Sequence, residues 1–260
     1  LFRLIQALLA QKAEKEALQA AREAASRNPE SAEFLEEYVR VLRWMKQYAE
    51  AETVLRLFMG SHGASEGVHV LLAQVQLEAG RAAEAEQSLA AAEKLASDPS
   101  VFLRRASAIC LRAGATEAAL RFARRVVEAQ PDDVSAHAAL VEALRAAQRD
   151  DEALQAAESA FKTHADSPAF LQMLMAQRVA RKQWDAALRE LDDYLARHPE
   201  QAGVQWMKAD TLAAAGRNDA AFEALEKAEA LLGAGASPDL LARLSRSYTA
   251  LKRYPEAERT

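Results

Sequence analysis

The stretch QWDAALRELDDYLARHPE, from Gln183 to Glu200, contains the residue that sets the organisation of the chain. Ala187 recurs at a constant interval of 34 residues through the sequence. The alanines in this register are Ala17, Ala51, Ala85, Ala119, Ala153, Ala187 and Ala221, and Ala257 follows after 36 residues. An acidic residue stands one or two positions before each of them. The sequence therefore consists of copies of one repeated unit, with a loop insertion before the eighth copy.

A 34-residue period around a fixed small residue is typical of a helix-turn-helix unit that buries its apolar face by stacking on its neighbours. The chain resembles the tetratricopeptide repeat (TPR) family, in whose own count the small residue is position 20. Proline at the helix-ending position 32 and glycine at the turn position 15 carry the resemblance: Pro29, Pro131, Pro199, Gly80, Gly114 and Gly216. The usual glycine at position 8 is absent, and the tryptophan at position 4 is mostly Leu. The resemblance implies an all-α, right-handed α-solenoid.

We expect one solenoid of about 7.5 repeats, a segment of a longer protein. Its units run approximately over 1–31, 32–65, 66–99, 100–133, 134–167, 168–201, 202–237 and 238–260. Each unit should hold a first helix of about 13 residues and a second of about 14. The acidic residues before the recurring alanine should begin the second helix, where the helix dipole favours a carboxylate.

Composition narrows the classes of partner. A net charge of −5 and a pI near 5.7 argue against nucleic-acid binding. No apolar run approaches the roughly 18 residues that span a bilayer, so we expect no membrane insertion by this segment. Cys110 is the single cysteine, which excludes an internal disulfide, and we expect it to be a small buried hydrophobe.

Helical periodicity divides each first helix into two faces. Positions 4, 7, 8 and 11 should pack inward, and positions 2, 5, 9, 12 and 13 should face the concave groove that binds a partner's segment in the family. The candidate partner-binding residues in the groove are Arg40, Arg43, Trp44, Val70, Leu77, Arg104, Leu111, Arg112, Arg145 and Trp206. The arginines would pair with carboxylates on a partner, or with glutamates of their own surface. The two tryptophans would anchor a partner, or pack on a neighbouring helix.

No catalytic constellation is apparent in the sequence. It lacks a glycine-rich phosphate loop, a metal motif, and a nucleophile paired with histidine in a recognisable pattern. His164 and His198 are separated by one repeat and do not form a ligand set. We therefore expect no enzymatic activity, no metal and no cofactor. The Lys and Asn residues of the family's carboxylate clamp are missing too.

The sequence favours a non-catalytic scaffold that binds a protein partner through the groove. Its loose, Ala- and Arg-rich repeats without clamp residues resemble the TPR regions of bacterial envelope proteins that recruit enzymes of exopolysaccharide modification and export. That resemblance favours the bacterial periplasm, with the cytoplasm as the alternative. Two other functions stay open: a substrate-presenting arm of an enzyme whose catalytic domain lies outside this segment, and a self-associating array.

Overall fold

The computed structural model describes residues 2–11, 13–232 and 238–250, and within these ranges the regular secondary structure is helical throughout. The chain divides into two compact units, 1–148 and 149–260. The division falls inside the expected fifth repeat, between its two helices. The single continuous solenoid stays a prediction, and each unit is described by itself.

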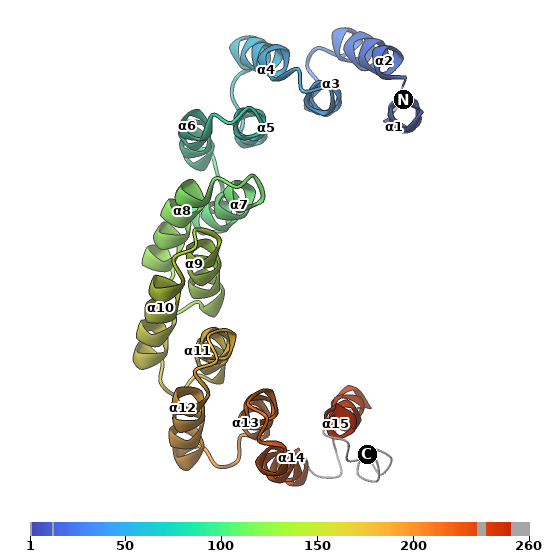
Figure 1. Ribbon diagram of the computed structural model, residues 1–260. Coiled ribbons are helices and arrows are strands. Elements are labelled where there is room, and N and C mark those ends of the chain that lie inside the picture. The colour runs from blue at the N-terminus through green and yellow to red at the C-terminus, as the bar shows by residue number, and fades with distance from the viewer. Residues whose placement is uncertain (1, 12, 233–237, 251–260) are drawn as a thin grey trace. The chain divides into compact units, whose positions relative to one another are not determined.

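The first unit contains four helical pairs and the first helix of a fifth (Figure 1). Its helices are α1 (Phe2–Ala10), α2 (Glu14–Arg27), α3 (Ala32–Trp44), α4 (Tyr48–His62), α5 (Glu66–Glu78), α6 (Ala82–Glu93), α7 (Pro99–Arg112), α8 (Thr116–Ala129) and α9 (Val134–Ala146). Figure 1 shows the first helices of the repeats, α3, α5, α7 and α9, along one side of this unit and the second helices along the other.

The second unit continues the alternation. Its helices are α10 (Asp150–Thr163), α11 (Pro168–Ala180), α12 (Trp184–Arg197), α13 (Ala202–Ala214), α14 (Asn218–Leu232) and α15 (Pro238–Ala250). Helix lengths of 13 residues for α11 and 14 residues for α12 match the expected pair. Ala257, the recurring alanine of the eighth repeat, lies outside the described residues.

The recurring alanine is buried in every repeat that the structure describes. Its exposed fraction is 0% at all seven positions: Ala17, Ala51, Ala85, Ala119, Ala153, Ala187 and Ala221. Each lies in the first two turns of a second helix, where that helix packs against its neighbours. A larger side chain has no room in such a close-packed interior. The register predicted from the sequence is therefore confirmed.

The turn between the two helices has the same backbone conformation in six repeats. Position 15 has a positive φ of 56–78° at Lys46, Gly80, Gly114, Gln148, Lys182 and Gly216. In the third repeat, the Gly80 N–H donates to the Leu77 carbonyl at 2.9 Å and the Arg81 N–H to the Gln76 carbonyl at 2.8 Å. These two bonds form a Schellman motif, which ends a helix by satisfying its last carbonyl groups. Glycine adopts this conformation without steric cost, whereas Lys and Gln do not.

The second helices begin without a side-chain cap. The residues preceding α2, α4, α6, α8, α10 and α12 make no capping hydrogen bond. All six of these helices have an acidic residue in the first turn, and so does α14. A carboxylate there interacts favourably with the helix dipole by about 0.3–1 kcal/mol. The expected placement of the acidic residues is confirmed.

The core is formed mainly between successive helices. Position 8 of the first helix, expected to face inward, is at most 4% exposed in the first seven repeats: Ile5, Val39, Ala73, Ser107, Val141, Met175 and Ala209. In the eighth repeat, Ser245 is half-buried. Position 10, which the helical periodicity did not select, is buried too, at Val41, Val75, Ile109, Ala143, Gln177 and Thr211. The first helices from α3 to α13 are thus covered on more sides than a two-face division predicts.

Cys110 is fully buried on α7, as expected, within the cluster that joins the third and fourth repeats. Burial raises the pKa of its thiol to about 11. A thiol with such a pKa stays protonated near neutral pH, so Cys110 is a packing residue and not an activated nucleophile.

Candidate partner-binding surface

The exposed part of each first helix is narrower than the groove face expected from the sequence. Position 13 is exposed in all eight repeats whose first helix ends within the described residues: Ala10, Trp44, Glu78, Arg112, Ala146, Ala180, Ala214 and Ala250. In the first unit, Trp44, Glu78 and Arg112, with Arg43 and Arg145 beside them, form what we call the first-helix surface. Its members lie in the last turns of α3, α5, α7 and α9.

Val70 and Leu77 were expected to face the groove, but they are only 8% and 7% exposed. Both belong to the core cluster that α5 shares with α7, and Leu111 on α7 packs partly buried against the same cluster. Their expected accessibility is wrong because this core cluster covers positions 5 and 12 of α5. Their burial makes them supports for the surface.

The two candidate tryptophans have opposite environments. Trp44 is 63% exposed at the end of α3, as the groove hypothesis requires. Trp206 on α13 is 3% exposed and packs in a core cluster with Ala209, Leu212 and Tyr248. The expectation that Trp206 is accessible is therefore wrong, and the alternative of packing on neighbouring helices holds for it.

Three of the candidate arginines are bound by groups of their own chain. Arg40 on α3 forms an ion pair with Glu37 one turn earlier, with Nε 2.9 Å from Oε2. The Arg104 guanidinium on α7 donates to Asp133 Oδ2 and Ser135 Oγ, both at 2.8 Å. The Ser135 hydroxyl and the nearby Arg104 charge hold the pKa of Asp133 below its usual value.

Arg43 is held most firmly of these. Its Nε and Nη2 donate to the two oxygens of Glu78 on α5, at 3.0 and 2.5 Å, and its Nη1 donates to Gln74 Oε1 at 3.0 Å. The side chain is 24% exposed. A bidentate guanidinium–carboxylate pair fixes both side chains, so this bridge between adjacent repeats is rigid.

Arg112 and Arg145 differ from the other three. Both are exposed, in the last turns of α7 and α9, and neither has a hydrogen-bond or ion-pair partner among the described residues. Their charges are therefore available to a ligand. A cation near a helix C-terminus is also favoured by the helix dipole.

A small hollow on the first-helix surface joins residues from three repeats. It has a volume of about 180 Å³ and is lined by Arg43 from α3, by Gln74, Leu77 and Glu78 from α5, and by Ile109, Arg112 and Ala113 at the end of α7. The sequence predicted Arg43, Leu77 and Arg112 as site residues, and the structure brings these three together. Trp206 is not among the residues that line this hollow.

Ion pairs between successive second helices were not expected from the sequence. Arg121 on α8 forms two hydrogen bonds with Glu86 on α6, at 2.6 and 2.5 Å. Arg125 on α8 binds Glu93 on α6 in the same way, at 2.8 and 2.5 Å. The only signal in the sequence is an arginine 32 or 35 residues after a glutamate. Such spacings arise wherever charged residues repeat, so the signal is weak.

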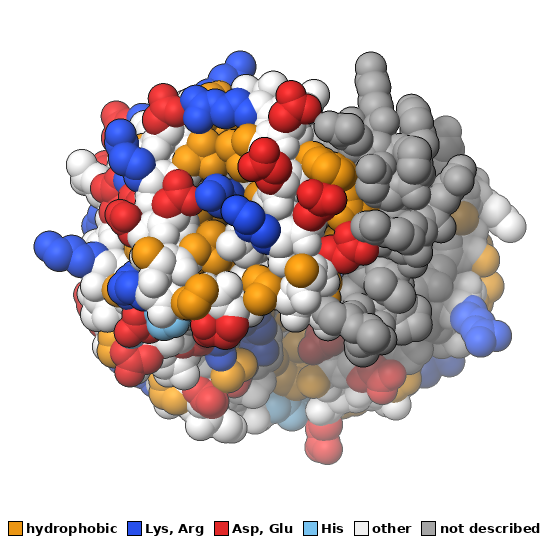
Figure 2. Space-filling view, turned by 90° about the horizontal axis from the view of Figure 1, so that it is seen from below, with side chains coloured by type: hydrophobic (Ala, Val, Ile, Leu, Met, Phe, Trp, Pro, Cys, Tyr) orange, Lys and Arg blue, Asp and Glu red, His pale blue; other side chains and the backbone are white. Residues whose placement is uncertain are grey.

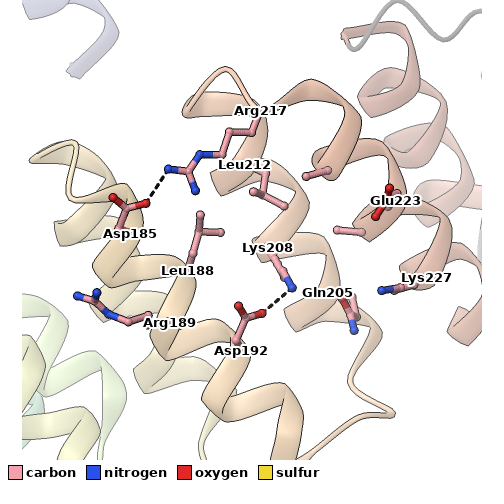
Figure 3. A pocket seen from close by; sticks show the side chains of 12 residues that line it. Asp185, Leu188, Arg189, Asp192, Gln205, Lys208, Leu212, Arg217, Glu223 and Lys227 are labelled. Carbon is pink, nitrogen blue, oxygen red and sulfur yellow. Dashed lines mark hydrogen bonds and ion pairs between the residues drawn. The ribbon is translucent and has the colours of Figure 1, made fainter.

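Larger hollows lie elsewhere. In the second unit, one of about 560 Å³ is formed by α12, α13 and α14 (Figure 3), and one of about 530 Å³ by residues from α13, α14 and α15. In the first unit, a hollow of about 340 Å³ lies between α2, α3 and α4. On the face in Figure 2, Lys and Arg side chains stand beside Asp and Glu around hydrophobic side chains. Helical periodicity does not locate such hollows, because they form between different helices and not along one face of a single helix.

The described residues contain no group of three or more His, Cys, Asp or Glu side chains placed to hold a metal ion. His164 stacks on Phe170, with ring centroids 4.2 Å apart, and His198 Nε2 lies 3.1 Å from Asp166 Oδ1. These contacts explain both histidines as packing and surface residues. None of the described helices is long and apolar enough to cross a membrane.

Comparisons with known proteins agree with the repeat register. A family model of the tetratricopeptide repeat matches residues 177–239, which run from the end of α11 into α15. No curated protein matches the sequence.

Several solved structures have a similar arrangement of helices. A tetratricopeptide repeat protein from Parabacteroides merdae is 18% identical over 86% of this chain and 88% of its own, with a TM-score of 0.46. PilW, a type IV pilus biogenesis factor, is 19% identical over 75% of this chain and 89% of its own, with a TM-score of 0.45. MamA from Desulfovibrio magneticus RS-1 is 20% identical over 63% of this chain and 91% of its own, with a TM-score of 0.41.

The similarity to this family covers residues 177–239, and the internal register extends beyond them. The recurring alanines of the matched segment, Ala187 and Ala221, are buried, as are those at the same repeat position in the other described repeats. The left-handed turn at position 15 recurs in the same way. The matched segment is thus similar to the tetratricopeptide repeat family, and its helical register recurs along the described residues.

Proposed function

We propose that this chain is a protein-interaction scaffold whose first-helix surface binds an acidic segment of a partner protein. The observation that carries the proposal is the pair Arg112 and Arg145, two exposed guanidinium groups on adjacent first helices with no partner among the described residues. Arg40, Arg43 and Arg104 are paired internally, so the available positive charge of this surface lies at these two residues.

Two unpaired arginines favour a ligand with carboxylates. A guanidinium fork matches a carboxylate with two parallel hydrogen bonds, and such charge-assisted bonds are stronger than neutral ones. Arg112 and Arg145 lie in the last turns of packed helices, α7 and α9, so their backbone positions are fixed before binding. Preorganisation of this kind lowers the entropy cost of ordering the site.

Trp44 supplies an apolar contact on the same surface. Its side chain is 63% exposed, whereas the neighbouring Arg43 is locked to Glu78 and Gln74. Exposed tryptophans beside ordered polar groups are frequent anchors of protein interfaces. We therefore expect the bound segment to place an apolar side chain on Trp44 and acidic side chains on the two arginines.

The proposal is tested by affinity capture followed by titration. The parent chain and the variant Arg112→Glu, Arg145→Glu are used to capture partners from the native organism, and the purified partner is then titrated by calorimetry. We expect the variant to bind at least about tenfold more weakly, since each broken charge-assisted pair costs about 1.5–3 kcal/mol. Trp44→Ala should weaken binding as well.

The matched control is Lys15→Glu, Lys94→Glu. It makes the same change in net charge at exposed residues of the same unit, on α2 and just after α6. The control should bind like the parent. Equal binding by the parent and by the folded Arg112→Glu, Arg145→Glu variant would exclude the first-helix surface.

A narrower role, the recruitment of enzymes for exopolysaccharide modification and export, stays a prediction that depends on the Ala- and Arg-rich repeats alone. Capture of a polysaccharide-modifying enzyme by the parent, lost with the arginine variant, would support it.

The enzyme-arm alternative predicts a catalytic domain in the same open reading frame. Self-association predicts that the molar mass measured by light scattering increases with concentration. The expected lack of catalysis in this segment also stays a prediction.

A further inference from the structure

We propose a second binding site, in the hollow formed by α12, α13 and α14, that takes an acidic peptide segment with Arg189 and Lys227 as its cationic contacts. The hollow has a volume of about 560 Å³, within the range of ligand-binding sites. It lies within the second unit, and none of its lining residues belongs to the first-helix surface. This proposal does not depend on the function proposed above.

Two ion pairs build the walls of this hollow (Figure 3). Arg217, just before α14, binds Asp185 on α12 at 2.6 Å, and Lys208 on α13 binds Asp192 on α12 at 2.5 Å. The side chains of Arg217 and Lys208 are therefore already neutralised. They position the walls without attracting a further anion.

The remaining charges of the hollow favour an acidic ligand. Arg189 on α12 and Lys227 on α14 have no ion-pair partner among the described residues, and Glu223 is the one lining acid in the same condition. The lining thus has four cations against three acids, in a chain with a net charge of −5. Figure 3 shows Arg189 and Lys227 on opposite sides of the hollow, so one ligand with two separated carboxylates can meet both.

The floor of the hollow is apolar. Leu188, Leu212 and Ala224 line it and are 7%, 5% and 4% exposed. The lining residues of α12 run from Asp185 to Asp192, a rise of about 10 Å along the helix. About three residues of extended chain cover that length. The geometry therefore fits a short segment in which acidic side chains flank an apolar one.

The direct test uses a fluorescent peptide of repeated Glu-Leu-Glu triplets as the probe, with a Gln-Leu-Gln peptide of equal length as its neutral counterpart. Fluorescence anisotropy should show at least tenfold tighter binding of the acidic peptide to the parent chain. The variant Arg189→Glu, Lys227→Glu should lose at least tenfold in affinity. Carbodiimide joins a lysine amine to a carboxylate in contact with it, so mass spectrometry should find the peptide coupled to Lys227.

Matched variants make the outcome decisive. Lys162→Glu, Lys182→Glu changes the net charge equally within the second unit, and Arg112→Glu, Arg145→Glu alters only the first-helix surface. Both should bind the peptide like the parent. The proposal is overturned if the parent does not distinguish the two peptides, or if Arg189→Glu, Lys227→Glu binds normally while folded. A loss confined to the Arg112→Glu, Arg145→Glu variant would also overturn it and would support the first-helix surface instead.

Discussion

The Arg178 guanidinium at the end of α11 and the Glu190 carboxylate on α12 form two parallel hydrogen bonds, Nε to Oε2 at 2.9 Å and Nη2 to Oε1 at 2.5 Å. The two side chains are only 14% and 25% exposed. The position of Arg178 in its repeat is filled by Leu42, Cys110 and Leu144 in others. An ion pair here replaces an apolar contact between the two helices of a repeat.

We expect Glu190→Gln to lower the free energy of unfolding by about 1–3 kcal/mol, because it leaves a largely buried guanidinium with Glu158 as its remaining carboxylate partner. The double variant Arg178→Leu, Glu190→Leu should recover much of this loss, since an apolar pair of similar size suits the site. Urea denaturation of the two variants measures both effects. A double variant less stable than Glu190→Gln would mean that the charges themselves are required.

The left-handed turn at position 15 predicts which substitutions stabilise the array. Lys46, Gln148 and Lys182 have positive φ values of 58°, 59° and 56°, a conformation that costs a residue with a Cβ about 1–2 kcal/mol. Replacing each by glycine should raise stability by about 0.5–1 kcal/mol after the added flexibility of the unfolded chain is subtracted. Thermal unfolding of the single and combined variants tests this.

Gly114→Ala provides the reverse test. A Cβ at Gly114 would meet no heavy atom within 4 Å, so its effect comes from the φ of 74° alone. We expect a loss of about 1 kcal/mol. Unchanged stability would show that the turn relaxes when its residue changes.

The recurring alanine predicts a steric limit. Ala153 on α10 is 0% exposed, and Ala153→Leu should destabilise the fold by about 1–3 kcal/mol through overpacking. Ala176→Leu on α11 is the matched control, since Ala176 is an exposed alanine of the same unit. A lower melting temperature for Ala153→Leu, with Ala176→Leu close to the parent, is the expected result. Equal melting temperatures would contradict the register.

Stability at acidic pH should depend on Glu50. The Tyr38 hydroxyl donates to its Oε1 at 2.8 Å, and with the Arg22 guanidinium this holds the pKa of Glu50 below its ordinary value of 4.5. A carboxyl with a lowered pKa in the folded state contributes stability that is complete above the unfolded value and is lost as the pH falls through the folded one.

Glu50→Gln should therefore flatten the decline in the free energy of unfolding between about pH 5 and pH 3. Tyr38→Phe should flatten it in part, because the Arg22 contact remains. Denaturation at stepped pH values makes the comparison. A slope identical to that of the parent would show that Glu50 is not among the groups that titrate on unfolding.

The sequence predicted the repeat better than the surface. The buried alanines and the paired helices follow from spacing alone, because every stacked unit must solve the same packing problem. From the sequence, three buried side chains, those of Val70, Leu77 and Trp206, were expected to be accessible. Helical periodicity does not show which neighbouring helix covers positions 5 and 12. The pairing of Arg43 with Glu78 could not be predicted from the sequence, because it depends on the offset between adjacent repeats.

Burial of Cys110 gives this chain an intrinsic reporter of its own opening. The single thiol of the sequence is 0% exposed, and its pKa is raised to about 11. An alkylating reagent therefore reacts only during the moments when α7 detaches from its neighbours. The labelling rate at Cys110 then measures the free energy of that local opening without any engineered probe. A ligand that binds Arg112, two residues further along the same helix, should slow the alkylation of Cys110. The labelling rate then reports both the local opening of α7 and ligand binding.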